Sequence, residues 1–366
     1  MPGRVRWHRT ALAFLLLGGL AADSGAEPMR FAGAKPVTVR AAPLSSFEIG
    51  NADRIIFGDL EWLGGLELTG SSRHFGALSG VTLSDDGRDF VAVTDNGFWV
   101  SGRIESDGQG APVALSDVTM APLRDRTGAV LNLKSSADAE AITQATVNGR
   151  PVFLVAFERN HRIEVYPRAT GKDPVSEGAR PIRFNAPAGI RRLGANKGIE
   201  AIAAGLPDTP AAGLTIMFAE RGRPACSDIP AWLVQPDGTA RAFRVRQRDR
   251  FDVTDAVFLA NGDVVILERR FDYSTGIFMR LRRLPFSTLR TGRTVDGPIM
   301  MTADFTDQID NMEALGTHRE ADGSTVFTIL SDDNRSVLQR TLLLRFRLRE
   351  PEAGITPLPR PQASAE

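Results

Sequence analysis

The stretch that decides the fold begins at Glu200-Ala-Ile-Ala, passes through a Gly- and Pro-containing turn, and ends on Thr215-Ile-Met-Phe-Ala-Glu220-Arg-Gly. Two apolar runs of four to eight residues separated by turn residues are typical of paired β-strands. The first strand begins with an acidic residue, the opening acid, and the second ends with one, the closing acid. The stretch therefore predicts a β-hairpin that carries a carboxylate at each of its open ends.

The same pattern recurs along the chain. The opening positions are Ser79, Glu140, Glu200, Asp255 and Glu313, at intervals of 61, 60, 55 and 58 residues, and the closing acids are Asp95, Glu158, Glu220, Glu268 and Asp332. A period of this size built from antiparallel strands is typical of a β-propeller, whose blades bury their faces only by stacking around an axis. We therefore expect an all-β propeller of five blades, with a sixth blade as the alternative.

The two ends of the repeat region complement each other. The last copy has only Thr341–Leu348 left for its outer part, while the segment from Arg54 to Leu68 has no copy of its own. A closed ring leaves no exposed sheet edge. We expect the N-terminal strand to complete the final blade.

The N-terminus has the features of a secretory signal. Three Arg residues within positions 1–9 precede an apolar run of about a dozen residues, which falls short of the roughly 20 that a membrane span needs. We expect a signal peptide over residues 1–26, with an uncleaved anchor as the alternative, and a periplasmic or secreted protein. A linker over 27–50, the propeller domain over 51–348 and a disordered tail over 349–366 complete the predicted organisation.

The overall charge balance restricts the partners. The chain of 366 residues has 44 basic and 44 acidic side chains, so no global basic field is available to hold nucleic acid. One Cys and four His are too few for the usual Cys/His zinc clusters. We expect a monomer that binds a small molecule, with no nucleic-acid partner and no membrane span after signal cleavage.

Antiparallel pairing brings the start of the first strand and the end of the second to one end of each blade. Nine carboxylates are therefore expected on one rim, as ligands of a divalent cation: Asp95, Glu140, Glu158, Glu200, Glu220, Asp255, Glu268, Glu313 and Asp332. Hard oxygen ligands suit Ca²⁺ or Mg²⁺, and we favour Ca²⁺. Arg159, Arg221 and Arg269 each follow a closing acid and are candidates for binding an anionic substrate.

The alternative interpretation is architectural, because a repeated acid can accept backbone N–H groups in every blade, whereas a catalytic residue is needed only once. Departures from the repeat are then better clues to chemistry, such as Ser79 and the doubled acid at Asp332-Asp333. The chain has no Gly-x-Ser-x-Gly elbow, His-Glu-x-x-His pair or EF-hand loop. No catalytic residue is assigned, and Glu200, Glu158 and Asp332 are the candidates.

Several blocks of the chain resemble the phytase-like esterase domain family, the bacterial group described as "esterase-like activity of phytase". The blocks are Gly76-Ala-Leu-Ser-Gly, Asp138-Ala-Glu-Ala-Ile, Asn196-Lys-Gly-Ile-Glu-Ala, Phe251-Asp-Val-Thr-Asp-Ala-Val, Leu267-Glu-Arg-Arg-Phe, Asn311-Met-Glu-Ala-Leu, Ser331-Asp-Asp-Asn and Leu338-Gln-Arg-Thr-Leu-Leu-Leu. The resemblance covers about residues 50–348. It implies an exported, cation-dependent β-propeller that hydrolyses esters or phosphoesters, but no catalytic mechanism that transfers residue by residue.

Two classes of function follow. The first is an exported hydrolase of ester or phosphate-ester bonds that uses a divalent cation held by the carboxylate rim. The alternative is a non-catalytic periplasmic propeller that binds a ligand or an envelope partner through the same face. A calcium-dependent lactonase of the propeller type is a third and weaker interpretation.

Overall fold

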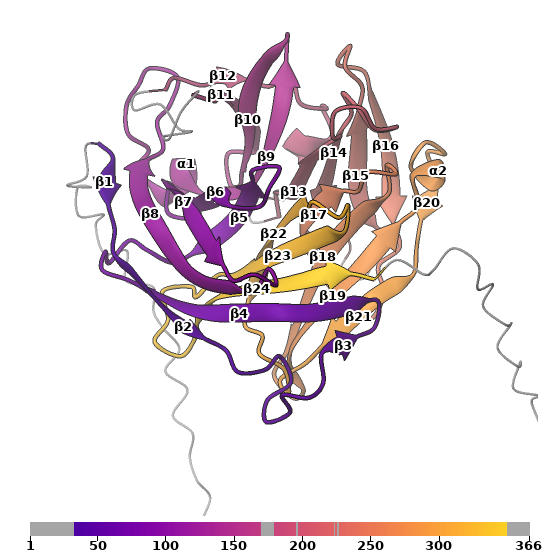
Figure 1. The fold of residues 1–366 in the computed structure, drawn as a ribbon. Coiled ribbons are helices and arrows are strands. Elements are labelled where there is room, and N and C mark those ends of the chain that lie inside the picture. Colours follow the sequence, from indigo (N-terminus) through magenta and orange to yellow (C-terminus); the bar gives the residue numbers. More distant parts are fainter. Residues whose placement is uncertain (1–32, 170–178, 195–196, 223, 225–226, 350–366) are drawn as a thin grey trace, which may run out of the picture.

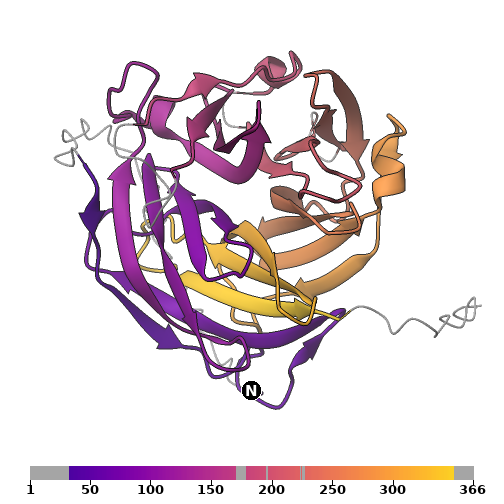
Figure 2. The ribbon, with the colours of Figure 1, turned by 45° about the horizontal axis from the view of Figure 1, so that its top comes forward.

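Five sheets surround one axis in the computed structural model, which describes residues 33–169, 179–194, 197–222, 224 and 227–349 (Figures 1 and 2). The innermost strands are β5 (Leu78–Leu83), β9 (Ala139–Val147), β13 (Ile199–Ala204), β17 (Asp252–Phe258) and β22 (Met312–Arg319). Each inner strand packs against the next, and β22 packs against β5. The predicted five-bladed propeller is therefore confirmed.

The other strands of each blade follow outward from the inner one. Blade one contains β6 (Asp89–Thr94), β7 (Phe98–Ser106), β8 (Pro112–Pro122) and β1 (Lys35–Pro36); blade two contains β10 (Arg150–Phe157), β11 (Arg162–Pro167) and β12 (Ile182–Arg183). Blade three contains β14 (Thr215–Ala219), β15 (Ile229–Val234), β16 (Ala240–Val245) and β20 (Thr294–Val295); blade four contains β18 (Val264–Asp272), β19 (Gly276–Leu284) and β21 (Ile299–Ala303). Blade five contains β23 (Thr325–Ser331), β24 (Thr341–Leu348), β4 (Leu60–Gly70) and β2 (Val39–Pro43), and β3 (Ile56–Phe57) pairs with β4. Two short helices, α1 (Lys134–Ala137) and α2 (Phe286–Leu289), and a 3₁₀ turn (Ile190–Arg192) lie in the connections.

Strands from the N-terminal and C-terminal parts of the described chain close the ring, as expected. Strand β4 pairs antiparallel with β24, so the N-terminal segment supplies the fourth strand of the last blade. Upstream of it, β2 extends blade five through β4, whereas β1 joins β8 of blade one. Residues 35–43, which fall in the predicted linker, are thus outer strands that connect the first blade to the last.

The second strands contain long apolar runs because both of their faces are covered by neighbouring blades. In β10 the side chains alternate between faces. Phe153, Val155 and Phe157 join the core shared with blade one, while Leu154 and Ala156 join the core shared with blade three. The hydrophobic core is therefore a set of layers between blades.

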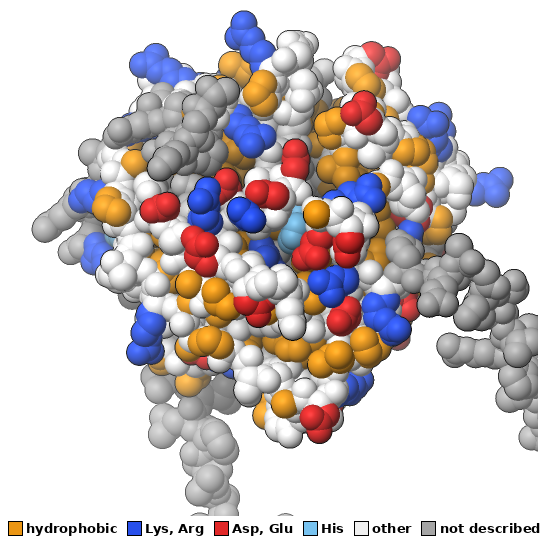
Figure 3. Space-filling view, viewed as in Figure 1, with side chains coloured by type: hydrophobic (Ala, Val, Ile, Leu, Met, Phe, Trp, Pro, Cys, Tyr) orange, Lys and Arg blue, Asp and Glu red, His pale blue; other side chains and the backbone are white. Residues whose placement is uncertain are grey.

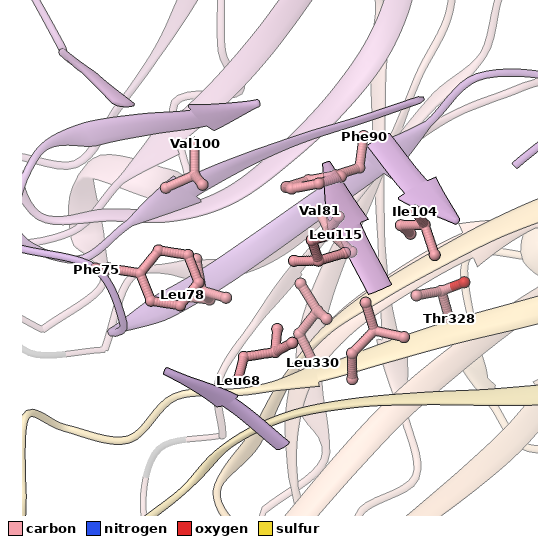
Figure 4. Close-up of a pocket in the computed structure, with 11 residues that line it drawn as sticks. Leu68, Phe75, Leu78, Val81, Phe90, Val100, Ile104, Leu115, Thr328 and Leu330 are labelled. Atoms are coloured by element: carbon pink, nitrogen blue, oxygen red, sulfur yellow. The ribbon is translucent and has the colours of Figure 1, made fainter. Parts of the chain in front are cut away.

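An apolar pocket lies between blades one and five. It is lined by Leu68, Phe75, Leu78, Val81, Phe90, Val100, Ile104, Leu115, Thr328, Leu330 and Leu343 (Figure 4). No charged side chain lines it. We assign it to packing at the seam where the ring closes.

The predicted signal peptide and almost all of the predicted tail lie outside the described residues. Within the described part of the chain, neither helix has the length and apolar character needed to cross a bilayer. In the view of Figure 3, acidic and basic side chains lie side by side and form no extended patch of one charge.

Candidate functional site

Every inner strand contains a β-bulge at the same place. The strand register shifts by one residue between Leu78 and Gly80, and equivalent shifts occur in β9, β13, β17 and β22. The bulged residues are Ser79, Glu140, Glu200, Thr254 and Glu313. Because a bulge leaves one residue out of the regular pairing, it sets that residue's side chain apart from the alternation of the strand.

Two further positions in each blade accompany the bulge. Two residues before it lie Ala77, Asp138, Gly198, Asp252 and Asn311. On the second strand, the residue that follows the partner of the residue before the bulge is Asp95, Glu158, Glu220, Arg269 or Asp332. The acidic residues at the bulges and at these two positions interact electrostatically from blade to blade through their carboxyl groups. We call this group the acidic cluster: Asp95, Asp138, Glu140, Glu158, Glu200, Glu220, Asp252, Glu313 and Asp332.

The expectation of a single rim is wrong for the two acids of blade four. The bulged residue there is Thr254, so Asp255 points elsewhere. Asp255 is 1 % exposed and accepts hydrogen bonds from the backbone N–H groups of Leu315 at 2.7 Å and Ala256 at 2.8 Å. It links blade four to blade five, which is the architectural role.

Glu268 is also displaced by one position along its strand. It pairs with Val253, one residue short of the equivalent of the other closing acids, and its side chain is fully buried. Its carboxylate accepts hydrogen bonds from Arg280 Nε at 2.7 Å and from Arg282 Nη2 at 2.6 Å. The position beside the acidic cluster belongs instead to Arg269.

The hydroxyl groups at the remaining bulges join adjacent blades. Ser79 Oγ donates to the carbonyl of Ala139 at 2.5 Å, and Thr254 Oγ1 donates to the carbonyl of Met312 at 3.1 Å. In both cases the acceptor is the residue just before the bulged Glu of the next blade. The missing acid at Ser79 is therefore explained by packing between blades.

Among the described residues, four basic side chains form ion pairs with members of the acidic cluster. Lys134 contacts Asp95 at 2.6 Å and also pairs with Asp138, which Arg159 reaches at 2.8 Å. The other two are Arg221, which bridges Glu220 and Asp252 at 2.6 Å each, and Arg269, which contacts Glu313 at 3.3 Å. The three predicted substrate-binding Arg residues are therefore at the site, but each is engaged with a carboxylate. Lys197 is a fifth basic side chain that acts on the cluster, through Asp252. Among the described residues, nine carboxyl groups thus face five basic side chains, and full ionisation would leave an excess of four negative charges.

This excess acts together with burial on the carboxyl groups. Burial, followed by repulsion from Glu220, Glu158 and Glu313, raises the pKa of Glu200 well above its usual range. The pKa of Glu140 rises for the same reasons, with Glu200 the largest charged contributor. The structure therefore favours proton or cation binding in the acidic cluster.

Two Asp residues show the same behaviour. Burial, followed by Glu313 and Asp95, raises the pKa of Asp332 to about 8. Burial also raises the pKa of Asp252 to about 6, although Arg221 opposes that shift. Both carboxyl groups can therefore exchange protons near neutral pH.

The tightest group of carboxylates comes from blade two. Asp138, Glu140 and Glu158 each offer one oxygen, and these oxygens lie within 4.8 Å of one another. Glu158 also accepts a hydrogen bond from the backbone N–H of Gly198 at 3.2 Å, which places it against blade three. Three hard oxygen donors at this spacing fit a divalent cation.

The structure thus brings together seven of the nine predicted acids, including the catalytic candidates Glu158, Glu200 and Asp332. It adds Asp138 and Asp252, which the acid repeat did not include. Asp138 could have been found from the sequence, because it stands two residues before the opening acid in Asp138-Ala-Glu140. Asp252 could not, because its relation to the bulge at Thr254 is visible only in the strand register.

Asp333, the second acid of the doubled pair, has an architectural role. Its Oδ1 accepts the backbone N–H of Ala77 at 3.0 Å, and its Oδ2 accepts the hydroxyl of Thr341 at 2.9 Å. It connects the loop after β23 to the start of blade one.

Comparisons with solved structures find other propellers at low similarity. A structure titled "Structure of Dos1 propeller" has a TM-score of 0.36 and 8 % identity, covering 79 % of this chain and 75 % of that one. An endo-arabinase from Bacteroides thetaiotaomicron VPI-5482 has a TM-score of 0.45 and 9 % identity, covering 74 % of this chain and 94 % of the enzyme. Neither likeness adds to the fold described above.

No curated protein matches the sequence. A family model, however, matches residues 73–335, which is well over half of the chain and includes the entire acidic cluster. That family is named phytase-like and described as "esterase-like activity of phytase". The chain therefore belongs to the phytase-like family.

Proposed function

We propose that the protein is an exported hydrolase of ester or phosphate-ester bonds that works with a divalent cation, Ca²⁺ in preference to Mg²⁺, bound by the acidic cluster. The observation that carries this proposal is the convergence of nine carboxyl groups from all five blades, which outnumber the basic side chains around them in the described part of the chain. Membership of the phytase-like family supports the reaction class.

Asp138, Glu140 and Glu158 are the residues that would hold the cation. Their oxygens have the required spacing and chemistry, and Asp138 is almost fully buried. When bound, a divalent cation polarises a carbonyl or phosphoryl oxygen and makes water more acidic. Lys134 and Arg159 compete for Asp138, so they limit how much negative charge that group presents.

Glu200 is our choice for the group that accepts a proton. It stands on the neighbouring bulge, and burial together with the surrounding carboxylates raises its pKa. A carboxylate with a raised pKa is a better base near neutral pH than an ordinary one. Glu200 would take the proton of the attacking water and later return it to the leaving alcohol.

Arg159, Arg221 and Arg269 are placed to meet an anionic substrate group only by exchanging their present partners. Arg159 has the most exposed side chain of the three, at 42 %, against 33 % for Arg221 and 26 % for Arg269. Arg159 would therefore make the first contact.

The proposal is tested by calorimetric titration with Ca²⁺ and Mg²⁺ and by hydrolysis of p-nitrophenyl esters and p-nitrophenyl phosphate, with and without a chelator. In Glu140→Gln we expect cation affinity to fall at least about ten-fold and hydrolysis to fall with it. The matched control is Glu61→Gln in outer strand β4, whose carboxylate pairs with Arg347 at 3.2 Å.

Two results would contradict the proposal. Hydrolysis that survives the chelator would remove the role of the cation. Cation binding without turnover of any ester or phosphate would favour the non-catalytic binding protein.

A further inference from the structure

The guanidinium group of Arg335 has no carboxylate partner among the described residues and is held instead by neutral groups of blade one. In the amide orientation that satisfies the hydrogen-bond network, the side-chain oxygen of Asn96 accepts from Arg335 Nη2 at 2.6 Å and from Nε at 3.1 Å, while its nitrogen donates to Thr94 Oγ1 at 2.8 Å. Nη2 also faces Nδ1 of His74 at 3.4 Å. Arg335 therefore differs from the three Arg residues considered above, each of which pairs with a carboxylate.

This arrangement leaves one end of the guanidinium group unused. A guanidinium group has five N–H donors in one plane. Those of Nε and Nη2 point toward Asn96 and His74, whereas the two N–H groups of Nη1 have no partner in the described part of the chain. The Arg335 side chain is exposed. Two N–H groups of a charged side chain can therefore donate to an anion.

The backbone around Arg335 is fixed by Asp333. The Oδ1 of Asp333 accepts the backbone N–H groups of Arg335 and Ala77, each at 3.0 Å, and its Oδ2 accepts the hydroxyl of Thr341 at 2.9 Å. Asn334 and Arg335 both have positive φ, at 46° and 52°. Such a conformation is uncommon for Arg, and side chains held in it cluster at ligand sites. The loop is therefore pre-organised at Arg335.

Arg335 lies beside the acidic cluster. Its partner Asn96 directly follows Asp95, a member of the cluster. Lys134 Nζ contacts Asp95 at 2.6 Å and also pairs with Asp138, one of the proposed cation ligands. An anion on Arg335 would thus be near the proposed cation site without occupying it.

The ring of His74 supports this position. Burial, followed by the charges of Arg335 and Arg73, lowers the pKa of His74, so the ring is neutral at neutral pH and accepts a hydrogen bond. Arg73 Nε lies 3.4 Å from the other ring nitrogen of His74. Two guanidinium groups therefore lie on either side of one neutral ring, and their shared positive field favours an anion.

We propose that Arg335 determines substrate specificity by binding a carboxylate or phosphate group of the substrate while the ester bond lies against the acidic cluster. This rests on the proposed hydrolase function. It narrows the substrates to esters that carry a negative charge away from the bond that is cleaved.

The kinetic test compares mono-p-nitrophenyl adipate, which has a free carboxylate, with its uncharged methyl ester, which has the same leaving group. In Arg335→Gln we expect KM for the charged ester to rise about five- to ten-fold, while KM for the methyl ester changes less than about two-fold. Arg335→Lys keeps the charge and should recover part of the loss. The control is Arg103→Gln in β7, whose guanidinium group pairs with Asp89 at 3.0 Å.

A second variant tests the same site without changing Arg335. In Asn96→Asp the acceptor of the guanidinium group becomes a carboxylate, which competes with an anion for it. KM for the charged ester should therefore rise in this variant as well. Circular dichroism and Tm verify that each variant is folded.

A binding measurement separates failure of this inference from failure of the hydrolase function. The chain has four His, so few ring signals appear in the NMR spectrum, and that of His74 is identified by its loss in His74→Asn. In cation-free protein at fixed pH, we expect inorganic phosphate and acetate to shift the His74 signal in the wild type and not in Arg335→Gln. The anion that binds more tightly identifies the chemistry of the substrate group.

The outcomes are distinct. If no ester is hydrolysed but phosphate or acetate shifts His74 only when Arg335 is present, the anion site is confirmed and the hydrolase function fails. If esters are hydrolysed and the ratio of the two KM values is the same in the wild type and in Arg335→Gln, this inference is overturned and the hydrolase stands. An equal shift of His74 in both proteins also overturns it.

Discussion

Replacing Glu268 by Gln tests the strand register that removes this acid from the acidic cluster. Glu268 is fully buried between Arg280 and Arg282, whose side chains are 1 % and 0 % exposed. Its carboxylate accepts four hydrogen bonds from them, at 2.7, 3.4, 3.0 and 2.6 Å. The substitution removes the charge that both guanidinium groups share.

The expected loss of stability follows from this geometry. Removing one partner of a buried ion pair costs about 3–5 kcal/mol. Asp249 and Asp296 remain in contact with Arg280 and Arg282, so we expect a loss near the lower value, about 3 kcal/mol. For a folded domain of about 300 residues the entropy of unfolding is roughly 0.6 kcal/mol per degree, so Tm should fall by about 5 °C.

The measurements are thermal and urea unfolding followed by circular dichroism, together with calorimetric Ca²⁺ titration. Glu268→Gln should lower stability and leave Ca²⁺ affinity unchanged. Glu200→Gln should raise the stability of the cation-free protein and weaken Ca²⁺ binding, because it removes a carboxylate that its neighbours repel. The reasoning is refuted if Glu268→Gln weakens Ca²⁺ binding while Tm stays within about 1 °C of the wild type.

Three further predictions concern the acidic cluster and its surroundings. Asp332 has a pKa of about 8 in the folded protein against an ordinary 3.8, so the cation-free protein should lose stability as pH rises from about 4 to 8. Urea unfolding across this pH range should show a smaller loss of stability in Asp332→Asn. Equal pH dependence of stability in the variant and the wild type would contradict this prediction. Asp255→Ala should cost about 2–4 kcal/mol in urea unfolding, because two buried backbone N–H groups lose their acceptor; a change below about 1 kcal/mol would argue against the architectural role. Arg159→Gln should raise Ca²⁺ affinity several-fold in calorimetry, because it frees Asp138 from a competing cation; weaker binding would disprove that competition.

The fold was predictable because its signals repeat. Apolar runs with turn residues between them mark the strands, and their period of about 60 residues marks the blades. The leftover segments at the two ends indicated the closure, and β4 beside β24 confirms it. The outer strands β1 and β2 gave no comparable signal, because they are short and largely exposed.

In four blades the structure places the predicted acids in the acidic cluster, although Asp138 of blade two was not among those predicted; in blade four neither predicted acid lies there. In blade four, Asp255 and Glu268 matched the pattern by residue type, but the bulge lies at Thr254. A shift of one residue turns a side chain to the opposite face of a strand. Intervals of 54 and 59 residues around Thr254 fit the repeat as well as 55 and 58 around Asp255, so spacing alone could not separate them.

The sequence also gave no indication of which basic side chains pair with the acidic cluster. Lys134 lies on a short helix before β9, and nothing in the repeat connects it with Asp95, the residue that it contacts 39 positions away. Such pairing depends on how loops cross between blades, which strand periodicity does not encode.

The pairing of β4 with β24 has a consequence for how the protein is made. A ribosome releases Leu60–Gly70 long before Thr341–Leu348, so the early strand must wait without its partner while the intervening blades are synthesised. Contacts between such distant segments are slow to form, and an unpaired apolar strand is exposed to aggregation in the meantime. Acquisition of the native state should therefore be completed only after translation has ended, with the docking of this strand as its last step.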